Sequence, residues 1–116
     1  MAIHLLRERA SPARVAEMGA AFADLGMIKI VVDVRRRVLA GGGGMHSDCE
    51  HVLLEDGSEQ DDLWGANWFP QDRSIEFESL INIRPRLGNR STVLRSAELR
   101  QAVEDTARAL LGGVET

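Results

Sequence analysis

Residues 75–91, IEFESLINIRPRLGNRS, combine an alternating apolar segment with a dense polar ending. Apolar side chains fall on one side of residues 75–84, which predicts the clearest β-strand of the chain. Several polar residues share the opposite side, so that face either borders water or lines a pocket. Pro85 would end the strand. We expect the rest of the chain to hold this strand and to present its polar ending. That ending consists of Asn82, Arg84, Asn89, Arg90 and Ser91.

The segments on either side predict four further strands and three helices. Runs rich in apolar and β-branched residues place the strands at 2–6, 27–34, 37–40 and 63–69. The predicted helices start at the N-caps Ser11, Ser47 and Ser96 and end at Gly26, Gly57 and Gly112. Glu50 follows Ser47 at the spacing of a capping box. The helical residues expected to face the core are Val15, Met18, Phe22, Leu25, Val52, Leu53, Leu99, Val103, Ala107 and Leu110.

The predicted order of elements is β-α-β-β-α-β-β-α, which favours an α+β fold. We expect a mostly antiparallel sheet of about five strands, with three helices on one face. The first six elements match the split βαβ pattern of a ferredoxin-like sandwich, and the fifth strand and third helix would be additions. A chain of 116 residues predicts a single α+β domain over residues 1–116.

Composition narrows the class of protein. Charged residues make up 28% of the chain and the net charge is −4, which is typical of a globular protein and argues against a general nucleic-acid binder. No apolar run approaches the roughly 18 residues of a membrane span. The first residues place charges after a short apolar patch, which is the reverse of a signal peptide. The single cysteine, Cys49, suits a reducing cytosol, so we expect a cytoplasmic location.

Charge is distributed unevenly along the sequence. Residues 48–62 contain seven acidic residues and no arginine or lysine, whereas residues 84–100 contain five arginines and one glutamate. Such surfaces can pair with each other, with a copy of the chain or with an anion, or they can remain solvated.

Four other features leave alternatives open. Histidine, cysteine and acidic residues crowd residues 46–51, but their helical positions diverge, so we expect no bound metal and no cofactor. The four glycines of 41–44 can form a connector or cradle a phosphate. Asp33, near a turn, can be hydrogen-bonded locally or act as a catalytic carboxylate. Trp64 and Trp68 share one strand face and are expected in the core, in an interface or against a ligand.

Several motifs are long and specific: VVDV, the pair Gly42 and Gly43, His46 with Asp48, LLEDGS, Gln60, LWGAN, and INIRP followed by GNRS. On these motifs the chain resembles, over nearly its whole length, a small prokaryotic family described as a domain of unknown function. The resemblance implies no particular activity. Gly44, Cys49 and His51 depart from the family pattern. The polar positions shared with the pattern are Asp33, His46, Asp48, Asn67, Asn82, Arg84, Asn89 and Arg90.

We expect a non-catalytic module that binds a small anionic ligand, either a carboxylate or a phosphate. Arginine offers such anions a planar fork of donors, and asparagine amides can orient the ligand. The predicted ligand-binding residues are His46, Asn67, Asn82, Arg84, Asn89 and Arg90, converging on one recess, and no catalytic residue is assigned. The alternative for Asn89 and Ser91 is that they fasten their loop to the sheet.

Two other classes of function remain open. The chain can be a homodimer or an inhibitor of another protein, acting through an uncovered tryptophan face or through residues 48–62. It can also be a small hydrolase or nuclease. His46 would then be the general base or acid, Asp48 or Glu76 would orient it, and Arg84 would stabilise negative charge. No catalytic motif accompanies these residues.

Overall fold

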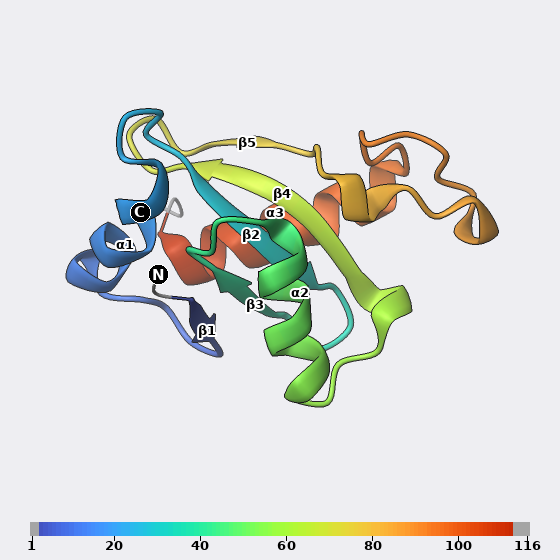
Figure 1. The fold of residues 1–116 in the computed structure, drawn as a ribbon, viewed down its shortest axis with the longest axis horizontal. Helices are drawn as coiled ribbons and strands as arrows, with labels where there is room; N and C mark the ends of the chain where they lie inside the picture. Colours follow the sequence, from blue (N-terminus) through green and yellow to red (C-terminus); the bar gives the residue numbers. More distant parts are fainter. Residues whose placement is uncertain (1–2, 113–116) are drawn as a thin grey trace.

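A computed structural model describes residues 3–112. At its centre is one five-stranded sheet with the strand order β1-β3-β2-β4-β5, in which every neighbouring pair is antiparallel. Figure 1 shows this sheet between the helices. The predicted α+β class and the order of the elements are confirmed. The strands are β1 His4–Leu6, β2 Ile28–Asp33, β3 Val38–Gly41, β4 Leu63–Phe69 and β5 Ser74–Glu76.

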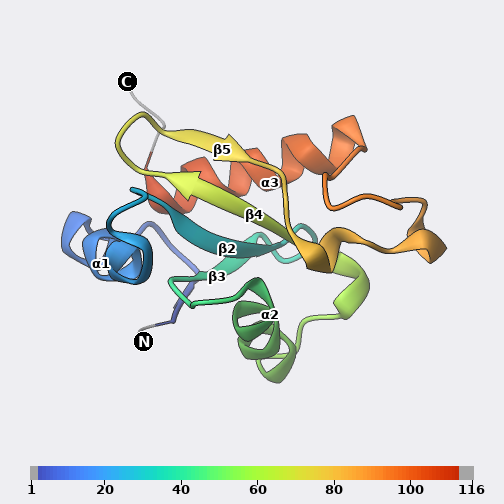
Figure 2. The same ribbon diagram turned by 45° about the horizontal axis from the view of Figure 1, so that its top comes forward.

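Three helices cover both faces of the sheet: α1 Pro12–Met18, α2 His46–Glu55 and α3 Ala97–Leu111. The face under α1 and α3 buries a core that includes Met18 and Val103. The other face packs against α2 through Cys49 and Leu53. Figures 1 and 2 show α2 and α3 on opposite sides of the sheet. The prediction that all helices share one face is therefore wrong.

The position of β4 explains the two-sided packing. β1 and β2 are parallel with β3 between them, and β3 and β4 are parallel with β2 between them. The connection from β1 through α1 to β2 and the connection from β3 through α2 to β4 cross the sheet in the same direction. Their first strands, β1 and β3, are antiparallel. Right-handed connections then place α1 and α2 on opposite faces. In a ferredoxin-like sandwich the second connection instead returns beside the first strand, so that part of the prediction is wrong.

The two tryptophans lie in the core, as one of the sequence interpretations predicted. Trp64 and Trp68 are 2% and 0% exposed and belong to the core cluster that also includes Val103 of α3. The tryptophan face is thus covered, and it does not provide the dimer surface that the sequence suggested. β2 is buried on both faces because Ile30 faces α3 and Val31 faces α2.

The long strand predicted over residues 75–84 is mostly wrong. β5 ends at Glu76, and the chain then leaves the sheet through the short 3₁₀-helices Leu80–Asn82 and Pro85–Leu87. This projecting segment, residues 79–93, extends from the body in Figures 1 and 2. The side-chain amide of Asn82 takes the place of a neighbouring strand. The N–H of Gly65 donates to its Oδ1 at 2.8 Å, and its Nδ2 donates to the Gly65 oxygen at 3.0 Å.

The start of α2 differs from the prediction. Ser11 and Ser96 cap α1 and α3 as expected. α2 begins at His46, two residues earlier than the capping box implied, with Met45 as N-cap and no hydrogen bond from a capping side chain. The capping box at Ser47 is therefore wrong, and the first turn of α2 keeps backbone N–H groups without an intrahelical acceptor.

The first helix is shorter than predicted. α1 ends at Met18 and continues as the 3₁₀-helix Gly19–Phe22, so Leu25, expected in the core, is 61% exposed.

Within residues 3–112, no helix has both the length and the apolar character needed to cross a membrane.

Candidate ligand-binding site

An open cavity of about 450 Å³ lies beside the first turn of α2. It is bounded by β2, β4, the start of α2 and the segment that leaves the sheet after β5. Its volume falls in the range of small-molecule sites. We call it the His46 cavity. Its lining residues are Lys29, Met45, His46, Ser47, Asn67, Glu78, Ser79, Leu80, Ile81 and Thr92.

The ring of His46 is tethered through one nitrogen. Its Nε2 lies 2.9 Å from the backbone oxygen of Ala66 and 3.0 Å from Oδ1 of Asn67. Nδ2 of Asn67 donates to Oε1 of Glu76 at 3.1 Å, which turns the amide oxygen toward His46. Because both neighbours of Nε2 are acceptors, Nε2 carries the hydrogen and Nδ1 keeps its lone pair. No residue between 3 and 112 donates a hydrogen bond to Nδ1, so this atom can accept one from a ligand.

His46 is held in its neutral form at neutral pH. The side chain is only 8% exposed. This burial lowers the pKa of His46 below its ordinary value, and the positive charge of Lys29 acts in the same direction. The hydrogen bonds to Ala66 and Asn67 oppose the shift without reversing it. The cavity therefore contains a neutral hydrogen-bond acceptor at His46 rather than a charge.

We expect His46 to make the folded chain less stable in acid. Because folding lowers the pKa of His46, the unfolded chain takes up this proton first as the pH falls below about 6.5. The contribution of His46 to the free energy of unfolding is complete above that pH. It is lost as the pH falls through that value toward the lower pKa of the folded state. Denaturant unfolding between about pH 7 and pH 5 should show this loss.

The loss should be smaller in His46→Gln than in the unchanged chain. His51→Gln is the control, because the side chain of His51 is 71% exposed and lies away from the cavity. An equal loss of stability in His46→Gln and in the unchanged chain would contradict the assignment.

Lys29 gives the cavity an unpaired positive charge. It is the only lysine of the chain and lies opposite Asn67 in the β2–β4 pair. Its ammonium lies 5.2 Å from the ring centroid of Phe22. Among residues 3–112, no carboxylate forms an ion pair with Lys29. The uncapped first turn of α2 also lines the cavity and adds the positive end of the helix dipole.

Asn82 and Asn89 hold the projecting segment and do not line the His46 cavity. Asn82 is fully buried and paired with Gly65. Nδ2 of Asn89 donates to the backbone oxygens of Asn82, Ser91 and Val93 at 2.8 to 3.1 Å. Asn89 therefore ties together residues of the projecting segment, whereas the interpretation had it fasten the loop to the sheet.

Arg84 lies in a different depression, of about 380 Å³. Its guanidinium donates to Oε2 of Glu50 at 2.9 Å and to the backbone oxygen of Gln60 at 2.7 Å. It also lies 5.0 Å from the ring centroid of Trp64. Arg84 is thus already neutralised by a carboxylate of α2.

The predicted ligand-binding residues do not converge on one recess. Of the set, His46 and Asn67 line the His46 cavity, whereas Arg84 lines the second depression. Arg90 is exposed and lines neither. The prediction of a single recess is wrong, because the projecting segment carries its polar residues away from the sheet.

The acidic segment pairs with arginines of the same chain. Glu50 forms an ion pair with Arg84, and Asp56 forms ion pairs with Arg7 and Arg36. Asp61 pairs with Arg86, and Asp62 pairs with Arg35. Hydrogen bonds from Arg36 and Arg7 hold the pKa of Asp56 below its usual value. Of the pairings that the sequence suggested, the one between faces of the same chain is the one observed. It leaves less unpaired acidic surface for a basic partner.

Within residues 3–112, no group of three histidine, cysteine, aspartate or glutamate side chains could hold a metal ion.

The model of one protein family, described as "Protein of unknown function (DUF5674)", matches residues 4–110. The chain belongs to this family. No curated protein and no solved structure matches the chain. Membership confirms the family resemblance predicted from the motifs.

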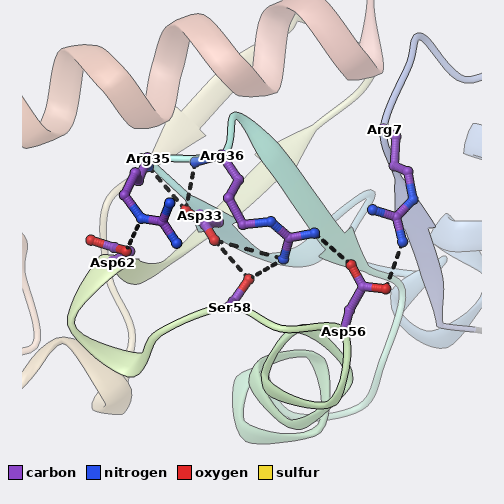
Figure 3. A network of polar contacts seen from close by, with 7 residues as sticks. All are labelled: Arg7, Asp33, Arg35, Arg36, Asp56, Ser58 and Asp62. Atoms are coloured by element: carbon purple, nitrogen blue, oxygen red, sulfur yellow. Dashed lines mark hydrogen bonds and ion pairs between the residues drawn. The ribbon is translucent and has the colours of Figure 1, made fainter.

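In this DUF5674 chain, two of the sequence motifs meet at the turn between β2 and β3 (Figure 3). Asp33 of VVDV is fully buried, and its Oδ1 accepts the N–H groups of Arg35 and Arg36 at 2.9 and 2.8 Å. Its Oδ2 accepts from the hydroxyl of Ser58, in LLEDGS, at 2.6 Å. Arg36 also donates to Ser58 and Asp56, at 2.7 Å each. Asp33 is therefore hydrogen-bonded locally, with both oxygens occupied, and holds the turn.

Of the ten residues that line the cavity in this DUF5674 chain, only His46 and Asn67 were assigned to the site from the sequence, and the others include Lys29, Glu78 and Thr92. Lys29 did leave a signal, because it is the only lysine and interrupts the apolar run of β2. Glu78 falls in the segment that was assigned to an overlong strand. Thr92 left no signal, since its place depends on how the projecting segment folds back.

Proposed function

We propose that this DUF5674 protein is a non-catalytic module that binds a small molecule through an anionic group, with the His46 cavity as the site. The observation that carries the proposal is the unpaired ammonium of Lys29 beside the uncapped first turn of α2. A carboxylate or phosphate would supply the missing negative charge and accept the backbone N–H groups of the helix start. The buried free thiol of Cys49 suits the cytoplasm, where we place the module.

This site replaces the arginine site that the sequence suggested. Arg84 has a carboxylate partner in Glu50, so an incoming anion would have to compete with an existing ion pair. Lys29 has no such partner within residues 3–112. The homodimer and inhibitor functions have less support, since the tryptophans are buried and four acidic residues of 48–62 are paired.

We expect Lys29→Gln to weaken anion binding by about tenfold or more, because the cavity loses its only lysine. A thermal-shift screen of short carboxylates and of inorganic phosphate would find a binder, and isothermal titration would give its affinity for each variant. Arg90→Gln is the matched control, since Arg90 is exposed and outside the cavity. Undiminished affinity in Lys29→Gln together with weakened binding in Arg90→Gln would overturn the proposal.

One observation favours a second candidate, a small hydrolase or nuclease. Glu76, Asn67 and His46 form a hydrogen-bonded chain that orients a neutral imidazole with Nδ1 open, as a general base requires. Arg84 no longer serves this function, because Glu50 holds it outside the cavity. Turnover of ester or phosphodiester substrates that disappears in His46→Gln would support the enzyme. An absence of turnover would exclude it for those substrates.

A further inference from the structure

The His46 cavity has a negative side as well as a positive one. Glu78 lines the cavity, and its Oε2 accepts only from the hydroxyl of Thr92, at 3.3 Å. Glu76 lies next to it, with Oε1 accepting from Asn67. Among residues 3–112, neither carboxylate forms an ion pair with a cation. The cavity thus contains an unpaired carboxylate at Glu78 and an unpaired ammonium at Lys29.

Within residues 3–112 no ion pair joins Lys29 to Glu78, and strand register separates Lys29 from the neighbouring Glu76. Lys29 of β2 lies opposite Asn67 of β4, and Asn67 lies opposite Glu76 of β5. Two strand spacings, about 10 Å, therefore separate the backbone positions of Lys29 and Glu76, and Glu78 follows two residues after Glu76, beyond the end of β5. The amide of Asn67 fills the middle position and is occupied by His46 and Glu76. A ligand, rather than a direct contact, can bridge the two charges.

The cavity also contains both hydrogen-bond donors and hydrogen-bond acceptors. The lining includes donors: the ammonium of Lys29, the Ser47 hydroxyl and the start of α2. The lining also includes acceptors: the carboxylate of Glu78 and Nδ1 of His46, which is 8% exposed. An ammonium group is donor-only and matches the second set, whereas a carboxylate is acceptor-only and matches the first.

We propose that the ligand is a small zwitterion of the α-amino acid class. This inference rests on the proposed function and specifies its ligand. The carboxylate binds at Lys29, and the ammonium donates to Glu78 and to Nδ1 of His46, the first residue of α2. Met45 and Leu80 line the cavity and are 59% and 76% exposed, so they offer apolar contact to the side chain of the amino acid.

The test compares amino acids with their two halves. A thermal-shift screen of the common L-amino acids identifies the strongest binder. Isothermal titration then compares that amino acid with the carboxylic acid lacking its amino group and with the amine lacking its carboxylate. We expect each half to bind about tenfold more weakly or worse. For L-leucine the two halves are 4-methylpentanoate and isopentylamine.

Variants separate the two ends of the ligand. Glu78→Gln should weaken the amino acid about tenfold and leave the deaminated acid unchanged, whereas Lys29→Gln should weaken both. Glu98→Gln is the matched control, because Glu98 is exposed on α3, away from the cavity. Equal binding of the amino acid and the deaminated acid would overturn the zwitterion and leave the anion-binding module intact. No binding by any amino acid, simple carboxylate or phosphate would overturn both.

Discussion

Replacing Asn82 with aspartate is expected to lower the free energy of unfolding by about 3 kcal/mol or more. Asn82 is fully buried, and its Nδ2 donates to the backbone oxygens of Gly65 at 3.0 Å and Thr92 at 3.2 Å. An ionised aspartate would turn a carboxylate oxygen toward both of these acceptors. The change keeps the size of the side chain, so the loss would report on hydrogen bonding rather than on packing.

The loss should also shrink as the pH falls. A carboxylate buried against two carbonyl oxygens has a raised pKa, because the protonated form restores a donor. The folded variant then binds this proton more tightly than the unfolded chain, and the penalty is relieved below the folded pKa. Denaturant unfolding of Asn82→Asp at neutral and acid pH would measure this. Gln71→Glu, which adds a carboxylate at an exposed loop position, is the control. A loss below about 1 kcal/mol at neutral pH would contradict the structural role of Asn82.

Gly65→Ala is expected to cost about 3 kcal/mol, because the projecting segment packs directly on this glycine. A Cβ at Gly65 would lie 2.6 Å from the Cβ of Ser79 and 2.7 Å from its Oγ. Ser79 is 5% exposed and caps the 3₁₀-helix Leu80–Asn82, so it has little room to move. The same shift would disturb the Asn82 amide, which bonds the backbone of Gly65.

A double-mutant cycle isolates this contact. Ser79→Gly alone should cost about 1 kcal/mol through the lost cap. In the Gly65→Ala background the same change removes both clashing atoms, so the double variant should be more stable than the sum of the single losses by about 1 to 3 kcal/mol. If the losses of unfolding free energy in the two single variants simply add in the double variant, there is no steric contact between a side chain at position 65 and Ser79.

The order of the elements could be predicted because periodicity and serine caps are local properties. The strand predicted at 75–84 failed for a related reason. The alternation of Ile75, Phe77, Ile81 and Ile83 specifies an extended chain but not its hydrogen-bond partner. In the fold, a single amide of Asn82 replaces a strand, and the chain turns away at Ser79. Which face each helix covers depends on β4 lying beside β2, and no local pattern encodes that neighbour.

Two of the ten residues that line the His46 cavity followed from the sequence. His46 and Asn67 were recognised as polar groups at a helix start and on a strand, and the fold joins them at 3.0 Å. Arg84 was predicted to bind the ligand because no local pattern indicates its ion pair with Glu50. The two residues lie 34 positions apart in the chain. Lys29 was missed because a lone lysine in an apolar strand resembles an edge residue until its neighbours are known.

The proposed function requires that a ligand bind at the His46 cavity and not at the arginines of the projecting segment. Its most direct test is to titrate the ¹⁵N-labelled protein with the strongest carboxylate-containing binder of the thermal-shift screens. The spectra to follow are those of the histidine ring, asparagine amide and arginine side-chain nitrogens. Binding should shift Nδ1 of His46 and the amide of Asn67 and leave Arg84 and Arg90 unchanged. Shifts at Arg84 and Arg90 with none at His46 would contradict the claim.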